Sequence, residues 1–144
     1  MKKMVLFAAI IVSIMLVGAC KSAPPETTED SFKRVYDRYY ADLILDGARE
    51  YTVKGGDTLS AIARTHYNSG LYYPLIMLAS KDIVLDPDKI EPGMVLTIPD
   101  LQVNLANDKA KASIKSVLLD CANIEDSRDR ATTAQGLRDQ ANGL

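Results

Sequence analysis

The sequence predicts an α+β protein in which a small strand–helix–helix–strand unit is flanked by additional helices. Residues 50–99 combine two short β-type runs with two helical patterns, and amphipathic segments with helical spacing stand on either side. A chain of 144 residues is also too short for a barrel or a doubly wound sheet. Two strands alone are marginally stable, so we expect them to pair as an antiparallel sheet that packs on the two helices.

The composition argues against several classes of function. The chain carries 17 Lys and Arg against 19 Asp and Glu, a formal net charge of −2, with one His and two Cys. This balance argues against a surface that neutralises phosphates, so we expect no nucleic-acid partner. A Cys/His zinc site would need carboxylates to complete it, and we expect neither a metal site nor a cofactor.

Residues 1–19 have the features of an export signal. Lys2 and Lys3 form a short basic head, and no charged residue follows from Met4 to Cys20. The apolar run is shorter than the about 20 apolar residues that a membrane-spanning helix needs. A plain membrane anchor is therefore the weaker interpretation.

The end of this segment, Val17-Gly18-Ala19-Cys20, resembles the lipobox of bacterial lipoproteins, in which Gly18 is a less usual occupant. The resemblance implies cleavage before Cys20 and acylation of that residue, which would anchor the chain to a membrane. The alternative is an ordinary secretory signal with a chance Cys. Lys21 replaces the Asp that tends to retain lipoproteins at the inner membrane, so it favours the outer membrane, facing the periplasm. Residues 20–30 are expected to be the acylated Cys and a flexible tether.

Residues 31–48 are predicted to form an amphipathic helix. Asp30 or Ser31 is a candidate N-cap, and Gly47 is a candidate stop. Apolar and tyrosine side chains recur at spacings of three and four, at Phe32, Val35, Tyr36, Tyr39, Tyr40, Leu43 and Ile44. Such a stripe is usually a packing face, and stacking of the tyrosines on sugars is the alternative.

Residues 50–99 are expected to fold as strand, helix, helix, strand. The strand candidates are Tyr51-Thr52-Val53 and Val95-Leu96-Thr97-Ile98, and a glycine turn follows the first of them. Asp57 or Thr58 is placed to cap the first helix, and Pro74 suits the first turn of the second.

This segment resembles a LysM module. The matching runs read YTVKGGDTLSAIA, from Tyr51 to Ala63, and DPDKIEPGMVLTIP, from Asp86 to Pro99. The resemblance implies binding of polymers that contain N-acetylglucosamine, chiefly peptidoglycan and chitin. Ser80 and Met94 depart from the Asn and Gln that many members carry at these positions.

The resemblance also implies a glycan site made by two segments, the glycine turn with the helix start and the loop after the second helix. The residues carried over are Gly56, Asp57, Thr58, Leu59, Ser80, Lys81, Asp82 and Ile83. A glycine turn before a helix exposes backbone N–H groups, and Asp57 and Thr58 add polar side-chain atoms. The alternative for these two residues is helix capping alone.

Residues 100–144 are expected to form a helical region. Asn107 or Asp108 is placed to cap one helix, and Ser127 to open another. The apolar face is too thin to fold alone, so we expect it to pack on the rest of the chain. The alternative is that these helices bind a partner protein.

The residues that carry chemistry in other proteins have ordinary structural explanations here. His66 stands near the end of a predicted helix, Cys121 lies in an apolar repeat, and Asp86 and Asp88 flank a proline turn. We therefore expect a non-catalytic envelope protein that binds peptidoglycan. The alternative hypothesis is an envelope scaffold whose LysM unit binds no sugar and whose flanking helices dock another protein, such as a wall-remodelling enzyme.

Overall fold

The computed structural model describes residues 26–144. The expected signal segment, Cys20 and residues 21–25 of the tether lie outside the described residues. The helices and strands follow one another as α1 (Thr28–Tyr39), the 3₁₀ turn η1 (Tyr40–Asp42), β1 (Arg49–Thr52), α2 (Leu59–Tyr67), η2 (Gly70–Tyr72), α3 (Tyr73–Ala79), β2 (Val95–Ile98), α4 (Leu101–Ala106), α5 (Asp108–Ser127) and α6 (Ala131–Asn142). Among the described residues, no helix combines the length and the apolar character that crossing a membrane requires.

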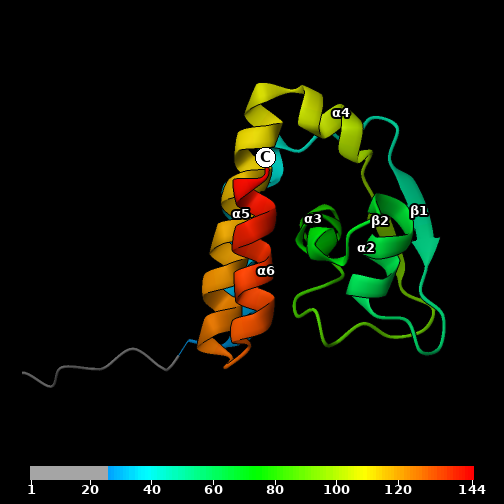
Figure 1. The fold of residues 1–144 in the computed structure, drawn as a ribbon. Coiled ribbons are helices and arrows are strands. Elements are labelled where there is room, and N and C mark those ends of the chain that lie inside the picture. The colour runs from blue at the N-terminus through cyan, green and yellow to red at the C-terminus, as the bar shows by residue number, and fades with distance from the viewer. Residues whose placement is uncertain (1–25) are drawn as a thin grey trace, which may run out of the picture.

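The α+β prediction is confirmed. β1 and β2 form a two-stranded antiparallel sheet in which Tyr51 lies opposite Leu96. α3 packs against both β2 and α2, and all seven of its residues are buried. A helix that is apolar on every side belongs inside a core. Figure 1 shows α3 between the sheet and the long helices α5 and α6.

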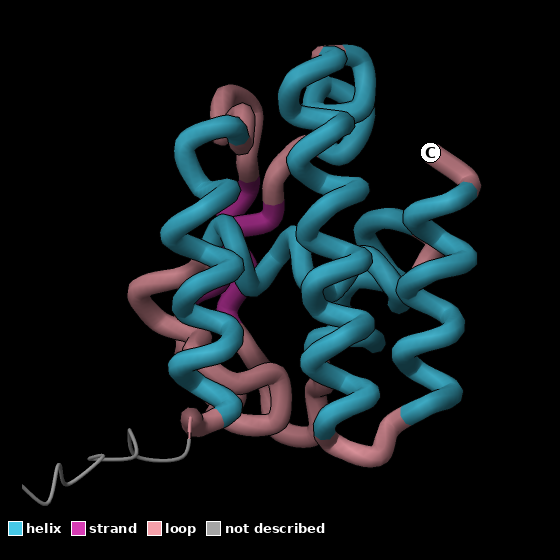
Figure 2. Tube along the Cα trace, turned by 90° about the vertical axis from the view of Figure 1, so that its left-hand side faces the viewer, coloured by secondary structure: helices cyan, strands magenta, loops and turns pink. Residues whose placement is uncertain are grey.

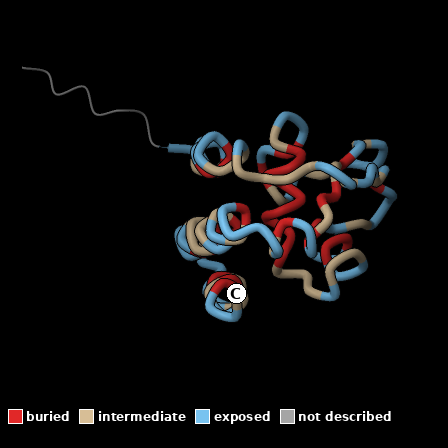
Figure 3. The backbone as a smooth tube through the Cα atoms, turned by 90° about the horizontal axis from the view of Figure 1, so that it is seen from above, coloured by how far each residue is buried: buried red, intermediate tan, exposed pale blue. Residues whose placement is uncertain are grey.

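The flanking helices form a layer of their own. α1, α5 and α6 run side by side, with α5 in contact with both neighbours (Figure 2). The buried stretches of the chain gather where this layer meets α3 and the sheet (Figure 3). Side chains from all three flanking helices join one core with α2, α3 and β2, including Phe32, Leu118 and Leu137. The helical flanks therefore cover the strand–helix–helix–strand unit.

Helix α1 differs in its limits from the helix expected over residues 31–48. It begins at Thr28, because Thr27 and Asp30 form a reciprocal capping box that satisfies backbone N–H groups of the first turn. It ends at Tyr39, and the chain then passes through η1 and an extended stretch to β1. Gly47 has a φ of +76° in the turn before β1, so it shapes the entry to the strand and not the end of the helix.

The turn between α5 and α6 also differs from expectation. Asn107 caps α5 as predicted, because its side chain accepts the Ala110 N–H. Ser127, however, is the last residue of α5, where its hydroxyl donates to the Ile124 carbonyl at 2.6 Å. α6 starts only at Ala131, after Asp129 has adopted a φ of +59°. The serine therefore satisfies a carbonyl at a helix end and does not cap the next helix.

Candidate functional site

The glycine turn between β1 and α2 is held by the Asp57 side chain. Asp57 Oδ2 accepts the Lys54 N–H at 2.8 Å and the Tyr51 hydroxyl at 2.8 Å. These two donors lower the pKa of the carboxyl group, with the backbone N–H of Lys54 as the larger cause. Gly56 has a φ of +87°, a conformation that L side chains rarely adopt. The turn is therefore a defined structure with an exposed glycine at its tip.

Thr58 and Leu59 begin helix α2. Thr58 is the N-cap, and its Oγ1 accepts the Ala61 N–H at 3.2 Å. The capping role predicted for Asp57 or Thr58 thus belongs to Thr58, while Asp57 closes the turn. Leu59 is buried, with 2% of its surface exposed, and it reaches both the core and the cavity beside the turn.

A cavity of about 280 Å³ lies beside this turn, and we refer to it as the groove. It is lined by Asp57, Thr58, Leu59, Ser60, Tyr73, Pro87, Asp88, Ile90, Glu125, Arg130 and Thr133. Its base includes the buried side chains of Leu59 and Tyr73, and Pro87 and Ile90 add partly exposed apolar surface. Seven of the eleven lining residues are polar or charged, so the groove combines a small apolar surface with several side chains that can hydrogen-bond a ligand.

The second expected segment, Ser80–Ile83, does not line the groove. Ser80 is buried, and its Oγ accepts the Thr97 N–H at 2.9 Å, so this side chain joins α3 to β2. Lys81 pairs with Asp82 at 2.8 Å and lies over the Tyr40 ring, with its Nζ 4.8 Å from the ring centre. Both line a separate hollow against α1, and Ile83 is 46% exposed. The two expected segments are therefore not brought together.

Comparison with known proteins identifies the unit that carries the turn. Residues 51–99 match the LysM domain family. This segment is a LysM domain. It starts in β1, ends just after β2 and includes the glycine turn and residues 87–90, which contribute to the groove. Helix α1 and helices α4 to α6 lie outside it.

Curated relatives match a stretch of this chain about as long as its LysM domain. The chain is 52% identical over 50 residues to the potassium binding protein Kbp of Escherichia coli, a match that covers 35% of this chain and 34% of Kbp. It is 45% identical over 56 residues to esterase Rv1288 of Mycobacterium tuberculosis, covering 39% of this chain and 12% of the esterase. The chain thus spans about a third or less of the relatives it matches. No solved structure matches the chain.

The sequence does not predict the wall of the groove that residues 87–90 form. Asp86, Pro87 and Asp88 make the turn that their residue types indicate, in which Asp86 Oδ1 accepts the Asp88 N–H at 3.0 Å. This turn nevertheless places Pro87, Asp88 and Ile90 in the groove. The available signal was the second LysM-like run, which begins at Asp86. The loop after α3 therefore reaches the groove through its later residues.

A third group of residues that line the groove comes from outside the LysM domain. Arg130, which precedes α6, contacts Asp88 with both guanidinium ends, Nη1 to Oδ1 at 3.1 Å and Nη2 to Oδ2 at 2.5 Å. Arg128 bonds to Asp88 as well and lies 3.4 Å from Asp86 Oδ1. These arginines lower the pKa of the Asp88 carboxyl group, with the Arg130 hydrogen bond as the largest cause. The ion pairs join the LysM loop to the α5–α6 turn.

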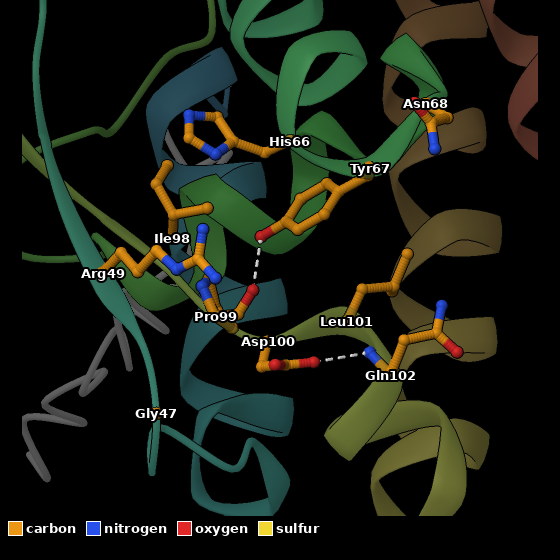
Figure 4. A pocket seen from close by; sticks show the side chains of 10 residues that line it. All are labelled: Gly47, Arg49, His66, Tyr67, Asn68, Ile98, Pro99, Asp100, Leu101 and Gln102. Atoms are coloured by element: carbon orange, nitrogen blue, oxygen red, sulfur yellow. Dashed lines mark hydrogen bonds between the residues drawn. The ribbon is translucent and has the colours of Figure 1, made fainter.

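A second hollow of about 320 Å³ lies between the end of α2 and the start of α4 (Figure 4). Two of its polar groups have structural partners: Tyr67 donates to the Pro99 carbonyl at 3.0 Å, and Asp100 accepts the Gln102 N–H at 2.9 Å. His66 lines this hollow from the last turn of α2, as its position in the sequence predicted. None of the expected glycan residues lies here. Within residues 26–144 no group of His, Cys, Asp and Glu is arranged to hold a metal ion.

Proposed function

We propose that this chain is a lipid-anchored protein of the bacterial envelope that binds peptidoglycan through its N-acetylglucosamine-containing glycan and catalyses no reaction. The observation that carries the proposal is the groove itself. Asp57, Thr58 and Leu59 of the LysM domain border a cavity in which four apolar or aromatic residues lie among polar and charged side chains. An acetamido group offers one carbonyl acceptor, one N–H donor and a methyl group, which match these surfaces.

The glycan contacts proposed here are a subset of those expected from the sequence. Asp57, Thr58 and Leu59, which line the groove, are retained, and so is Gly56, an exposed neighbour in the same turn that does not line it. Lys81, Asp82 and Ile83 remain accessible for a glycan that extends beyond the groove. The Ser80 hydroxyl is bonded to the backbone of β2, so we do not assign it to the ligand. A site of this size binds weakly alone, and a polymer offers many copies of the ligand.

The activities named for the relatives are not carried over. The matches to Kbp and to the esterase extend over 50 and 56 residues, which cover 34% and 12% of those proteins. Potassium binding and ester hydrolysis belong to the relatives as whole proteins. This chain shares with them a LysM-sized segment, which supports a common binding role and no shared chemistry.

Co-sedimentation with purified, protein-free peptidoglycan sacculi tests the glycan proposal. We expect residues 21–144 to bind saturably, and tetra-N-acetylglucosamine to compete while the glucose tetramer, which lacks acetamido groups, does not. A folded chain that stays in the supernatant would contradict the proposal. The alternative of a scaffold whose flanking helices dock another envelope protein would then account for the chain.

The lipid anchor rests on the residues Val17 to Cys20 and has its own test. We expect an alkyne analogue of palmitate to label the chain in bacteria, and a Cys20→Ser variant to lose the label. Cys121→Ser is the matched control, because Cys121 is buried with 1% exposure and burial raises the pKa of its thiol. Membrane fractionation should find the chain in the outer membrane, and Lys21→Asp should shift it to the inner membrane. Labelling that survives Cys20→Ser would contradict the anchor.

A further inference from the structure

The groove is closed on one side by helices that the LysM domain does not include. Glu125 near the end of α5, Arg130 in the turn and Thr133 in α6 all line it. In Figure 1 the lower ends of α5 and α6 lie beside the loop that follows α3, where the ion pairs of Arg130 and Arg128 with Asp88 join them. A ligand in the groove would therefore meet residues of the C-terminal region as well as the LysM turn.

Glu125 is a buried carboxylate with one unused oxygen. Its surface is 1% exposed, and its Oε1 accepts the Tyr73 hydroxyl at 2.9 Å and Arg128 Nη1 at 3.2 Å. Its Oε2 has no hydrogen-bond partner among the described residues, and Arg130 Nη1 is 3.6 Å away, beyond hydrogen-bonding distance. Buried polar atoms in folded proteins nearly always have a partner, so an unused oxygen on a residue that lines the groove needs an explanation.

We propose that the glycan site is composite: Glu125 Oε2 accepts the acetamido N–H of an N-acetylglucosamine unit in the groove, and Arg130 positions the Asp88 wall against it. This rests on the proposed function. It assigns one contact with the sugar to a residue outside the LysM domain. Glu125 would touch the ligand, whereas Arg130 is a positioning residue that acts through Asp88.

The chemistry of the groove fits this assignment. The neighbouring apolar surface of Leu59, Pro87 and Ile90 suits the methyl of the acetyl group. A carboxylate accepts hydrogen bonds and donates none, so its free oxygen requires a donor from the ligand. Arg128 and Arg130 place positive charge beside Glu125, at 3.2 and 3.6 Å from its two oxygens. A glucose unit carries a hydroxyl at the same ring position but has no methyl to fill the apolar part.

Arg130 has a matched control in the same hairpin. Arg130 is bonded to Asp88 on the groove wall, and Arg138 is bonded to Asp126 at 2.5 Å and does not line the groove. Arg138→Gln removes the ion pair with Asp126, whereas Arg130→Gln removes the ion pairs with Asp88 and Glu125. Asp88, in the loop after α3, loses one of its two arginine partners only in the Arg130 variant.

Calorimetric titration of the full chain in mild detergent, with tetra-N-acetylglucosamine and with the glucose tetramer, tests the composite site. We expect the wild type to prefer the acetylated tetramer, and Glu125→Gln to weaken that binding about tenfold, the loss of one hydrogen bond to a charged group. The same variant should also reduce the preference for the acetylated tetramer over the glucose tetramer. The Gln amide can turn its N–H toward the ligand, where a glucose hydroxyl can accept a hydrogen bond and an acetamido N–H cannot. Arg130→Gln should weaken binding a few-fold with the preference retained, and Arg138→Gln should leave it unchanged.

The outcomes separate the two proposals. A wild type that binds neither tetramer overturns the proposed glycan function and the composite site with it. A wild type that binds, with Glu125→Gln folded and unchanged in affinity and preference, overturns the composite site alone. If Glu125→Gln does not fold, the wild type is titrated into ¹⁵N-labelled tetra-N-acetylglucosamine and the N–H signals of the ligand are followed by NMR. One acetamido N–H signal should then move strongly downfield on binding, and its failure to move overturns the proposal.

Discussion

The two segments that the sequence assigned to one glycan site have different roles in the structure. Gly56–Leu59 forms a turn and a helix start beside the groove. Ser80–Ile83 joins α3 to β2 and faces α1, away from that cavity. The first segment is fixed by hydrogen bonds within six residues, whereas the second depends on contacts with distant parts of the chain. A sequence motif therefore predicts the geometry of a local turn more reliably than it predicts the path of a long loop.

The largest difference between the segments is expected at their apolar residues. Leu59 is 2% exposed, so Leu59→Ala should lower the free energy of unfolding by about 2–5 kcal/mol. Ile83 is 46% exposed, so Ile83→Ala should change it by less than about 0.5 kcal/mol. Urea denaturation followed by circular dichroism measures both. Equal losses would contradict the different roles assigned to the two residues.

Ser80 separates a structural role from a binding role. Ser80→Ala leaves the Thr97 N–H without its partner, which should cost about 1–3 kcal/mol of stability. Affinity for tetra-N-acetylglucosamine should stay as in the wild type below the melting temperature. Thermal melts and calorimetric titration give the two numbers. A variant that keeps its stability but loses the ligand would return Ser80 to the binding site.

The glycines at the turn provide a matched pair. Gly56 has a φ of +87° with nothing within 4 Å of an added Cβ, so Gly56→Ala introduces backbone strain without a clash. We expect a loss of about 1–2 kcal/mol in the free energy of unfolding, with weaker glycan binding as the turn changes. Gly55 has equally open surroundings and no positive φ, so Gly55→Ala is the control and should be close to neutral. Similar effects at both positions would show that conformation at Gly56 is unimportant.

The smallest effect is expected in the pH dependence of stability. The folded pKa of Asp57 lies below its ordinary value of 3.8, because the Lys54 N–H and the Tyr51 hydroxyl stabilise the carboxylate. The stabilisation is fully present above pH 3.8 and is lost as the pH falls through the lower folded pKa. Asp57→Asn should therefore destabilise the chain at pH 6 and have less effect at pH 2.5, as measured by urea denaturation. An effect that grows toward acid would reverse the sign of this account.

Much of the architecture was predictable from the sequence. The strand–helix–helix–strand order follows from residue spacing and turn residues, and the Thr58 cap and Pro74 mark the helix starts where the structure has them. The early start of α1 was missed because Thr27 lies in a polar stretch that resembles a tether, although Thr27 and Asp30 have capping-box spacing.

The composition of the groove was predictable only in part. The turn that contains Asp57 could be placed, because its hydrogen bonds are local. The contribution of Glu125 and Arg130 could not, since these residues are 35 or more positions from Ile90 and reach the groove only through the packing of α5 and α6 on the LysM domain. An amphipathic pattern indicates that a helix packs, and it does not indicate which charged residue at its end meets which loop.

Titration of the ¹⁵N-labelled chain with tetra-N-acetylglucosamine, followed by NMR residue by residue, tests the central claim most directly. The account expects saturable shifts at Gly55–Leu59, at Asp88–Ile90 and around Glu125 and Arg130, with the Ser80 signal little changed. Shifts confined to Ser80–Ile83, or to the hollow around His66 and Asp100, would contradict the location of the site.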